Sequence, residues 1–512
     1  MAFEPAGESY EDEPYAPLTY QQTHPDVLAA IGALLGMAPA PVERCRVLDV
    51  GCASGANIIA MAEGLPGSEF TGVDLSVRQV EEGQALAKAL GLANVSLRVG
   101  DILAVDPGEL GTFDYIIAHG VYSWTPAEVR DALLAACRQL LAPQGIAFVS
   151  YNALPGWSSL RALREMMQYR TRGTGSQREQ AAAAESLYRL LQQANPAESS
   201  SFGHFLAEYE AHVDGRHEVG LDRAASLLLH DELAAVNEPF YFHQFAEHAA
   251  AHGLQYLADA DFPTVFGTRL SPAVRAEIAS LARTPVEYQQ YLDFVANASF
   301  KQTLLCHEDV PLNRRIGNAF EPLRKLFAAS RARASAPQKG KSAHQFLGAD
   351  GAKLAVTSPV AVAAMQTLAE RFPVRVPVPD LVALARERTG AAAPPQEQAE
   401  LEVAAVLTQA FTYSSSLAQV HATPGPFTMT PGERPWTPAF VRWQLASGSR
   451  TVTNLALERI TLGPAHAALA ALFDGKRTRD EAFARMAEAH RIGRAKAERM
   501  TTTLAEMALF LA

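Results

Sequence analysis

A regular alternation of short apolar runs with amphipathic segments, over residues 46–151, constrains the fold of this chain more than any other feature. Between the runs, three amphipathic segments at 56–63, 77–90 and 126–141 are expected to be helices; Gly91 ends the second of them. This order predicts an α/β fold whose parallel sheet has helices on both faces. The five runs, typical of buried strands, are 46–50, 70–73, 95–99, 113–118 and 146–151.

At 512 residues the chain is too long for one ordinary domain, and its length suggests about three domains. We expect an N-terminal segment or lid over 1–44, the sheet domain over 45–157 and a helical middle region over 158–330. Residues 331–342 have the composition of a linker. The helices expected in the middle region are 159–169, 180–193, 202–213, 223–235, 245–252 and 286–295.

The C-terminal part, residues 343–512, is also predicted to be mainly helical. Helices expected over 359–372 and 378–386, and a third that ends at Phe411, have a spacing compatible with a winged-helix module. The final stretch, 452–512, adds a short strand candidate at 455–460.

Composition narrows the class of protein. The net charge of −11 disfavours nucleic acid as a partner, because an acidic surface repels phosphates, and it suits a basic protein or peptide better. The four cysteines lack metal-like spacing and are typical of reduced thiols. The first residues do not resemble a signal peptide, and no apolar run reaches the ~18 residues that span a bilayer. We therefore expect a soluble, cytoplasmic protein without membrane insertion.

The first site motif is the run Val47-Leu-Asp-Val-Gly-Cys-Ala-Ser-Gly55 at a strand-to-helix turn. Its glycines allow close approach of the backbone to a ligand, and they are four residues apart. A dinucleotide fingerprint requires the longer G-x-G-x-x-G. The shorter turn, with the acid Asp49, suits a cofactor that bears an ammonium group and lacks a phosphate. Taken alone, the run is also compatible with a plain tight turn.

Two further acids follow the next two strands. Asp74 at the end of the second strand can accept hydrogen bonds from ribose hydroxyls, although capping of the following helix would use the same position. Asp101 after the third strand can bind the adenine amine while Ile102 covers the ring. Because the three motifs recur in register in successive strand–helix units, they predict S-adenosylmethionine as the cofactor rather than a nucleotide.

Four longer stretches resemble one family. Residues 113–126, 150–157, 236–248 and 290–306 are similar to those of class I S-adenosylmethionine-dependent methyltransferases with a methyltransferase regulatory domain. The resemblance implies a Rossmann-like cofactor domain, a helical regulatory region, a winged-helix-like tail and a central open cavity. Its best-understood members are bacterial protein lysine methyltransferases that modify outer-membrane proteins, which implies a lysine side chain as acceptor. Tyr15-Ala-Pro17 departs from the family's usual N-terminal pattern, whereas Thr23–Asp26 keeps it.

The acceptor is expected beyond the carboxyl ends of strands four and five. An aromatic face attracts a sulfonium or a methylammonium by about 0.5–2 kcal/mol, and a tyrosine hydroxyl can accept a hydrogen bond from an amine. Core packing of Trp124, a histidine at 119 that only contacts cofactor or backbone, and helix capping by Asn152 remain alternatives. The residues predicted to be catalytic are Tyr122, Trp124, Tyr151 and Asn152. Those predicted to bind the cofactor are Tyr15, His24, Asp49, Gly51, Cys52, Ala53, Ser54, Gly55, Asn57, Asp74, Leu75, Gly100, Asp101, Ile102, His119, Gly120 and Val121.

Three functions remain open at this level: methylation of protein lysine by in-line displacement, methylation of a small molecule, and cofactor binding without turnover by a regulatory protein. His248 and His252 lie one helical turn apart, but the zincin arrangement is missing because Glu247 precedes the pair, so hydrogen bonds between helices are favoured over a metal site. A homodimer contact through the alanine-rich stretch 181–185 or the leucines at 227–229 is an alternative to packing within the chain.

Overall fold

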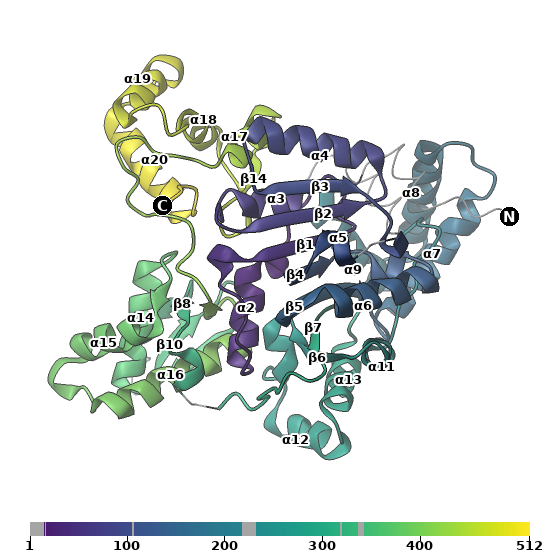
Figure 1. Ribbon diagram of the computed structural model, residues 1–512, viewed down its shortest axis with the longest axis horizontal. Helices are drawn as coiled ribbons and strands as arrows, with labels where there is room; N and C mark the ends of the chain where they lie inside the picture. Colours follow the sequence, from purple (N-terminus) through teal and green to yellow (C-terminus); the bar gives the residue numbers. More distant parts are fainter. Residues whose placement is uncertain (1–14, 16, 105–106, 218–231, 318–319, 336–342) are drawn as a thin grey trace.

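A seven-stranded sheet forms the centre of the protein, which we describe from a computed structural model (Figure 1). The structure describes residues 15, 17–104, 107–217, 232–317, 320–335 and 343–512. Along the sheet the strand order is β3-β2-β1-β4-β5-β7-β6. The strands are β1 (Arg46–Val50), β2 (Glu69–Asp74), β3 (Val95–Val99), β4 (Phe113–Ala118), β5 (Leu141–Asn152), β6 (Leu254–Asp259) and β7 (Phe300–His307).

The first five strands are parallel to one another, as the sequence predicts, whereas β7 is antiparallel to both β5 and β6. The sheet is therefore mixed, and the middle region expected to be helical contributes two of its strands. Leu304, Leu305 and Cys306 in β7 are fully buried. Short apolar runs of this kind do not reveal from periodicity alone whether they form a strand or a buried helix, which explains why these two strands were not predicted within a region that is otherwise mainly helical.

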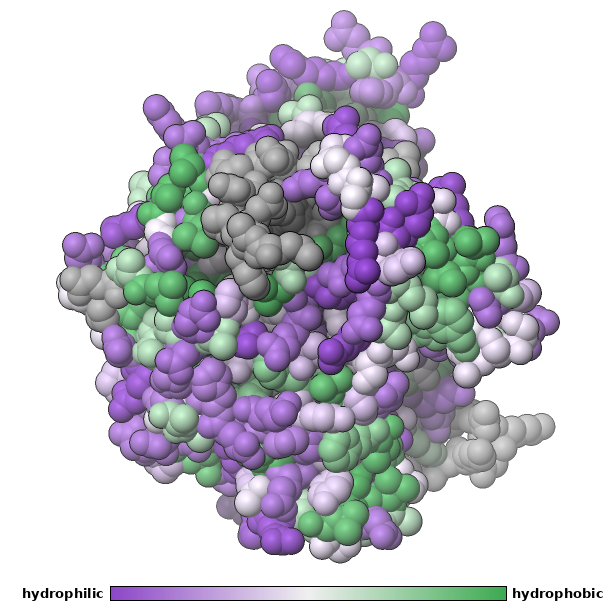
Figure 2. All heavy atoms as spheres, turned by 90° about the vertical axis from the view of Figure 1, so that its right-hand side faces the viewer, coloured by the Kyte–Doolittle hydropathy of each residue, from purple (hydrophilic) through white to green (hydrophobic). Residues whose placement is uncertain are grey.

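Helices α3 (Ala56–Ala62), α4 (Val77–Leu90) and α6 (Ala127–Leu140) follow strands as the sequence predicts. Beyond β5, helices α7 (Trp157–Thr171), α8 (Gln177–Ala194) and α9 (Ser201–His217) enclose a separate small core. The face on this side of the molecule mixes hydrophilic residues with separate apolar patches (Figure 2). The helix expected over 223–235 lies largely outside the described residues. Helices α11 (Phe242–Ala251), α12 (Pro272–Leu281) and α13 (Pro285–Ala296) flank β6 and β7 in sequence.

The C-terminal part consists of two units. Helices α14 (Pro359–Arg371), α15 (Val378–Thr389) and α16 (Gln396–Tyr413) pack together and share the large core with the sheet. Residues 333–335 of the expected linker form β9, which pairs with β10 (His344–Leu347). The second unit has a core of its own. It contains α17 (Ala439–Ala446), β14 (Thr451–Thr453), β15 (Arg459–Thr461), α18 (Pro464–Leu472), α19 (Arg479–His490) and α20 (Arg494–Glu506).

Across the described ranges, no helix combines the length and the apolar character needed to cross a membrane.

A buried ion cluster joins the N-terminal helix α2 (Pro25–Leu34) to the C-terminal part. Asp26 Oδ2 lies 3.1 Å from the Arg375 guanidinium and 2.7 Å from His421 Nδ1. Its Oδ1 accepts backbone N–H groups from Ala422 and Thr423. Burial alone would raise the pKa of Asp26, but Arg375 and the hydrogen bonds hold it well below its usual range. This carboxylate therefore ties together segments almost 400 positions apart in the sequence.

Removing the charge of Asp26 is expected to destabilise the protein strongly. In an Asp26→Asn variant Arg375 stays buried without its counter-ion, and breaking such a pair costs about 3–5 kcal/mol. The urea midpoint of unfolding reports the loss. The matched control is Glu370→Gln, which removes the exposed partner of Arg388 and should cost about 0–1 kcal/mol. Equal midpoints for the two variants would contradict a structural role for the cluster.

Acidification is expected to weaken the same region. Burial lowers the pKa of His24 from 6.5 to about 4, and burial with Arg375 lowers that of His421. Between these values the unfolded chain binds protons that the folded protein does not, so the free energy of unfolding should fall as the pH falls through this window. Urea midpoints measured across it test the slope. His24→Asn keeps a capping acceptor but cannot titrate, so it should flatten the decline; an unchanged slope would exclude His24 as its source.

Candidate functional site

The turn after β1 has the geometry that its glycines predict. Gly51 and Gly55 have φ of 70° and 68°, and Ala53 between them has φ of 51°. A Cβ at Gly51 would lie 2.7 Å from Val121 Cγ2, and one at Gly55 would lie 2.7 Å from Leu97 Cδ2. Both positions therefore require glycine for two reasons: the left-handed backbone conformation and the close packing against neighbouring side chains. The turn holds Gly51 beside Val121, which follows β4.

The two acids after β2 and β3 lie at the same edge of the sheet. Asp74 Oδ2 accepts the Ala53 N–H at 2.7 Å, and its Oδ1 accepts the Ser76 N–H at 2.9 Å. Asp74 thus links the glycine turn to Ser76, and it is Ser76, not Asp74, that caps α4; ribose binding by Asp74 stays a prediction. Asp101 Oδ1 accepts the Leu103 N–H at 2.9 Å. Leu75, next to Asp74, is half exposed and can cover an adenine ring.

Asp49 is a buried acid that fits a cationic ligand. Its side chain is almost inaccessible, and burial together with the nearby Asp74 raises its pKa to about 7. Among the described residues no lysine, arginine or histidine forms an ion pair with it. An ammonium or sulfonium group bound next to Asp49 would favour the ionised form of this carboxyl, so the site fits the cationic S-adenosylmethionine.

The N-terminal segment covers the end of β4. The ring of Tyr20 stacks on His119 with centroids 3.7 Å apart, and the Tyr15 hydroxyl lies 3.5 Å from that of Tyr20. Burial lowers the pKa of His119 to about 4, so its ring is neutral at physiological pH. The Gly120 N–H donates to Ser150 Oγ, which fixes the loop after β4 against β5. A neutral, stacked histidine agrees with the alternative to a general base.

Two of the predicted cofactor contacts take part in other interactions. His24 Nδ1 accepts the Asp26 N–H as the N-cap of α2. Asn57 Oδ1 accepts the Tyr20 N–H, and its Nδ2 donates to Thr23 Oγ1. These two side chains help to hold the N-terminal segment, Asn57 also hydrogen-bonds Asp49, and their contact with the cofactor stays a prediction.

Tyr122 and Tyr151, both predicted to be catalytic, are buried and hydrogen-bonded within the protein, and their contact with the acceptor stays a prediction. Tyr122 is 2% exposed and donates or accepts a hydrogen bond at 2.7 Å with His248 Nδ1. Tyr151 is fully buried, stacks on Phe245 and bonds Thr303 Oγ1. Side chains alternate along a strand, so a residue at the strand end can face the core rather than the site. Both tyrosines form the layer beneath the site.

Trp124 and Asn152 remain candidates at the acceptor side. Trp124 is half-buried, and its Nε1–H has no hydrogen-bond acceptor among the described residues. Asn152 Nδ2 donates to Asn237 Oδ1 at 2.7 Å, and the Asn152 N–H donates to Ser123 Oγ. The segment from Asn237 to Phe240 therefore lies across the ends of β4 and β5, where it closes one side of the site.

A cavity of about 440 Å³ lies on the β7 and β6 side of the same sheet edge. Phe300, which lines it, is paired with Asn152 across the strands and lies 6.2 Å from the His119 ring. The cavity wall also contains Lys301 and three acids. The aromatic ring of Phe300 therefore connects the cavity with the cofactor end of β4. The acids are Asp259, Asp261 and Asp293.

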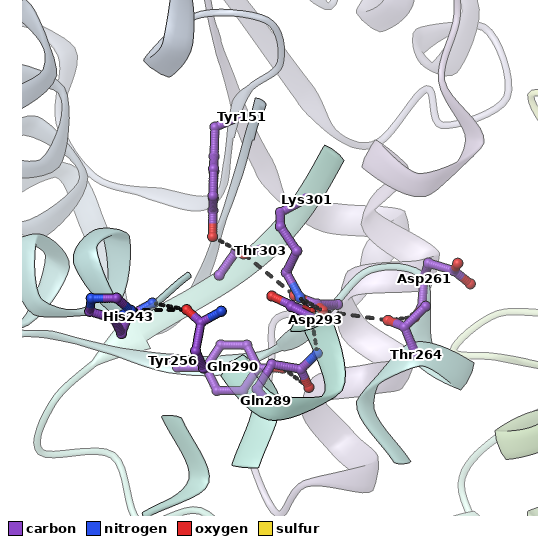
Figure 3. Close-up of polar contacts among 11 residues, drawn as sticks. Tyr151, His243, Tyr256, Asp261, Thr264, Gln289, Gln290, Asp293, Lys301 and Thr303 are labelled. Carbon is purple, nitrogen blue, oxygen red and sulfur yellow. Dashed lines mark hydrogen bonds and ion pairs between the residues drawn. The ribbon is translucent and has the colours of Figure 1, made fainter. Parts of the chain in front are cut away.

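Lys301 forms ion pairs with two of these acids (Figure 3). Lys301 Nζ bonds Asp259 Oδ2 and, at 2.9 Å, Asp293 Oδ1. Asp293 Oδ2 accepts no hydrogen bond from the part of the chain that the structure describes. Burial raises the pKa of Asp293 to about 6, since Lys301 only partly offsets it, and burial also raises that of Asp261. With three carboxyls against the Lys301 ammonium and the Arg269 guanidinium, which also lines the cavity and pairs with Asp350, the cavity keeps an excess of negative charge to offer a cation.

Reasoning from sequence missed Tyr20, Asn237, Phe300 and the Lys301 cluster as site residues. Asn237 and Lys301 lie inside stretches that carry the family resemblance, which was the available signal. The acids of the cavity come from separate elements, β6 with its following turn and α13, so no spacing in the sequence reveals them.

Comparisons with known families place three matches along the chain. Residues 47–145 match "Methyltransferase domain", residues 224–307 match "Predicted methyltransferase regulatory domain", and residues 433–508 match "PKMT, C-terminal winged helix domain". The winged-helix match thus covers the last unit, α17 to α20, and not the helices over 359–411 whose spacing had suggested such a module.

Relatives extend these matches. One uncharacterized protein of Rickettsia prowazekii is 36% identical over 60% of this chain, and the alignment spans only 54% of its length. Another is 38% identical over 47% of this chain and 93% of its own. The structure of PKMT2 from Rickettsia typhi, 26% identical, superposes with a TM-score of 0.82 over 98% of this chain and 100% of that one. The same protein in complex with AdoHcy gives 0.81.

Replacing Asp74 with alanine is expected to weaken cofactor binding at least about tenfold, near 1.4 kcal/mol, because ribose contacts are lost and the glycine turn loses its acceptor. Isothermal titration with S-adenosylmethionine or its demethylated product measures the change. The control is Glu82→Ala on the exposed face of α4, which should leave the constant as it is. An unchanged constant in Asp74→Ala would mean that Asp74 makes no contribution to cofactor binding.

The order of strands, the glycine turn with its three acids and the family matches agree with one another. The regulatory segment supplies two strands of the sheet and closes one side of the site. S-adenosylmethionine is the methyl donor for which this site is built. The chain belongs to the class I S-adenosylmethionine-dependent methyltransferases that carry a methyltransferase regulatory domain.

Proposed function

We propose that this enzyme methylates lysine side chains of proteins. The observation that carries the proposal is the likeness to PKMT2 of Rickettsia typhi along almost the whole of both chains, including a winged-helix unit that matches the PKMT tail. PKMT designates a protein lysine methyltransferase, in line with the family resemblance in the sequence. A match restricted to the cofactor domain would support only some methyltransferase, because a shared fold does not fix the substrate.

The acidic cavity supports a basic acceptor. A lysine reaches the enzyme as an ammonium, and removal of its proton at neutral pH costs about 4–5 kcal/mol. Carboxyls such as Asp261 and Asp293 attract the ammonium, and Phe300 offers an aromatic face between the cavity and His119. The amine must lose its proton before it attacks, because only its lone pair can form the new bond.

The bound cofactor supplies an electrophilic methyl group on a sulfonium, and transfer is an in-line displacement. The enzyme's own residues position the amine and exclude water. Tyr20 covers His119, while Asn152 and Asn237 fix the loop segments around the strand ends. Because His119 is neutral, it adds no positive charge next to the cationic cofactor.

The acceptor class can be tested directly. The enzyme is incubated with cofactor labelled in its methyl group and with unfolded outer-membrane proteins, a cell lysate or the small-molecule fraction of that lysate. Label in protein that acid hydrolysis releases as methyllysine supports the proposal. Label confined to small molecules would establish the small-molecule alternative. Tight cofactor binding with no label in any fraction would indicate a regulatory protein without turnover.

Asp261→Asn is expected to raise the KM for a lysine-containing acceptor by about three- to tenfold, since one negative charge is removed from the cavity. The dissociation constant of the cofactor should not change. The control is Asp309→Asn in an exposed turn after β7. Steady-state kinetics with labelled cofactor separates the two constants. An unchanged KM, or a loss confined to cofactor binding, would contradict a role of the cavity in recognising the acceptor.

A further inference from the structure

A second cluster of chemically versatile side chains lies outside the methyl-transfer site, between α6 and α11. It consists of Asp131 on α6 with His248 on α11 and His252 directly after it. Asp131 Oδ1 is 2.9 Å from His252 Nε2 and 3.4 Å from His248 Nε2. All three potential ligand atoms lie within 4.8 Å of one another. No carboxylate lies between the two histidines in the sequence, and Asp131 on α6 supplies one in space.

These atoms match the ligand preferences of zinc. Zn²⁺ binds histidine nitrogen and carboxylate oxygen at about 2.0–2.2 Å in tetrahedral geometry, which places neighbouring ligand atoms about 3.3–3.5 Å apart. The separations between Asp131 and the two imidazoles lie close to that value. Two histidines and one aspartate leave the fourth position for water or another ligand.

The environment of His248 provides a second, independent observation. Its Nδ1 is hydrogen-bonded to the hydroxyl of Tyr122 at 2.7 Å, so the ring presents Nε2 toward Asp131. Metal-bound histidines commonly have their other nitrogen held in this way. Tyr122 is fixed in the core by Phe240 and Phe245. The side chains of His248 and His252 are 28% and 18% exposed, so an ion could reach them although their rings are largely held in place.

We propose that Asp131, His248 and His252 bind a zinc ion that fastens the regulatory helix α11 to the methyltransferase helix α6. Tyr122 opens the short helix η4 (Tyr122–Trp124), which continues directly from the His119–Val121 loop at the cofactor site. An ion at this position therefore stabilises the contact between the regulatory segment and that loop. The proposal does not depend on the identity of the acceptor.

The test uses the full-length enzyme after treatment with a chelator. Equilibrium dialysis against zinc should give one bound ion per chain. Asp131→Asn and His252→Gln should each weaken binding by at least about tenfold. Zinc should raise the melting temperature of the unmodified enzyme and not that of these variants. Circular dichroism and melting of the variants without metal show that they are folded.

The matched control is His204→Gln on α9. His204 forms an i,i+4 pair with Glu208 that is more exposed, at 70% and 69%, and that has no third ligand among the described residues, so its removal should not change zinc binding. Absence of a stoichiometric ion in the unmodified enzyme, or equal affinity in the Asp131 and His252 variants, would overturn the proposal and leave the cluster as hydrogen bonds between helices.

Discussion

The antiparallel pairing of β7 with β5 is the interaction on which the rest of the structure depends. It runs from Ala147 opposite Leu305 to Asn152 opposite Phe300 and incorporates the regulatory segment into the catalytic sheet. The apolar middle of β7 completes the core, while its first residues reach the edge where the cofactor site lies. Phe300 and Lys301 consequently stand beside the ends of β4 and β5. The regulatory domain is therefore a structural part of the acceptor side, and a methyltransferase domain cut after β5 would lack the cavity.

Much of the cofactor site could be predicted because its signals are local. A glycine at φ near +70° and an acid at the end of a strand depend on a few neighbouring residues. The acceptor side could not be predicted in the same way. Asp259, Asp293 and Lys301 meet only after β6, α13 and β7 have packed, and Asp131 meets His252 only after α6 and α11 have packed. The burial of Tyr122 and Tyr151 could not be predicted either, because a position near the end of a strand does not show which face a side chain occupies.

Contacts between distant segments explain how the N-terminal segment is held over the site. Thr19 Oγ1 bonds Thr453 Oγ1 of the winged-helix unit, and Asn57 bonds the next residue, Tyr20. Glu63, just after α3, accepts the backbone N–H groups of Ala439 and Phe440 at the start of α17. The winged-helix unit is thereby attached to both the cofactor domain and the segment that covers it. The residue before Tyr20, whose ring stacks on His119, is thus hydrogen-bonded to the winged-helix unit.

The distribution of charge follows from the chemistry of two cations that must meet. At 4 Å, two unit positive charges repel by about 4 kcal/mol at an effective dielectric constant of 20. For the proposed lysine acceptor, two separate acidic groups would offset this repulsion: Asp49 with Asp74 at the cofactor turn, and Asp261 with Asp293 in the cavity. Phe300 lines the cavity and its ring lies 6.2 Å from that of His119, so the described link between the two groups consists of neutral rings. A carboxylate in this middle position would hold the acceptor as an ammonium, whereas neutral rings allow it to lose its proton as it approaches the methyl group.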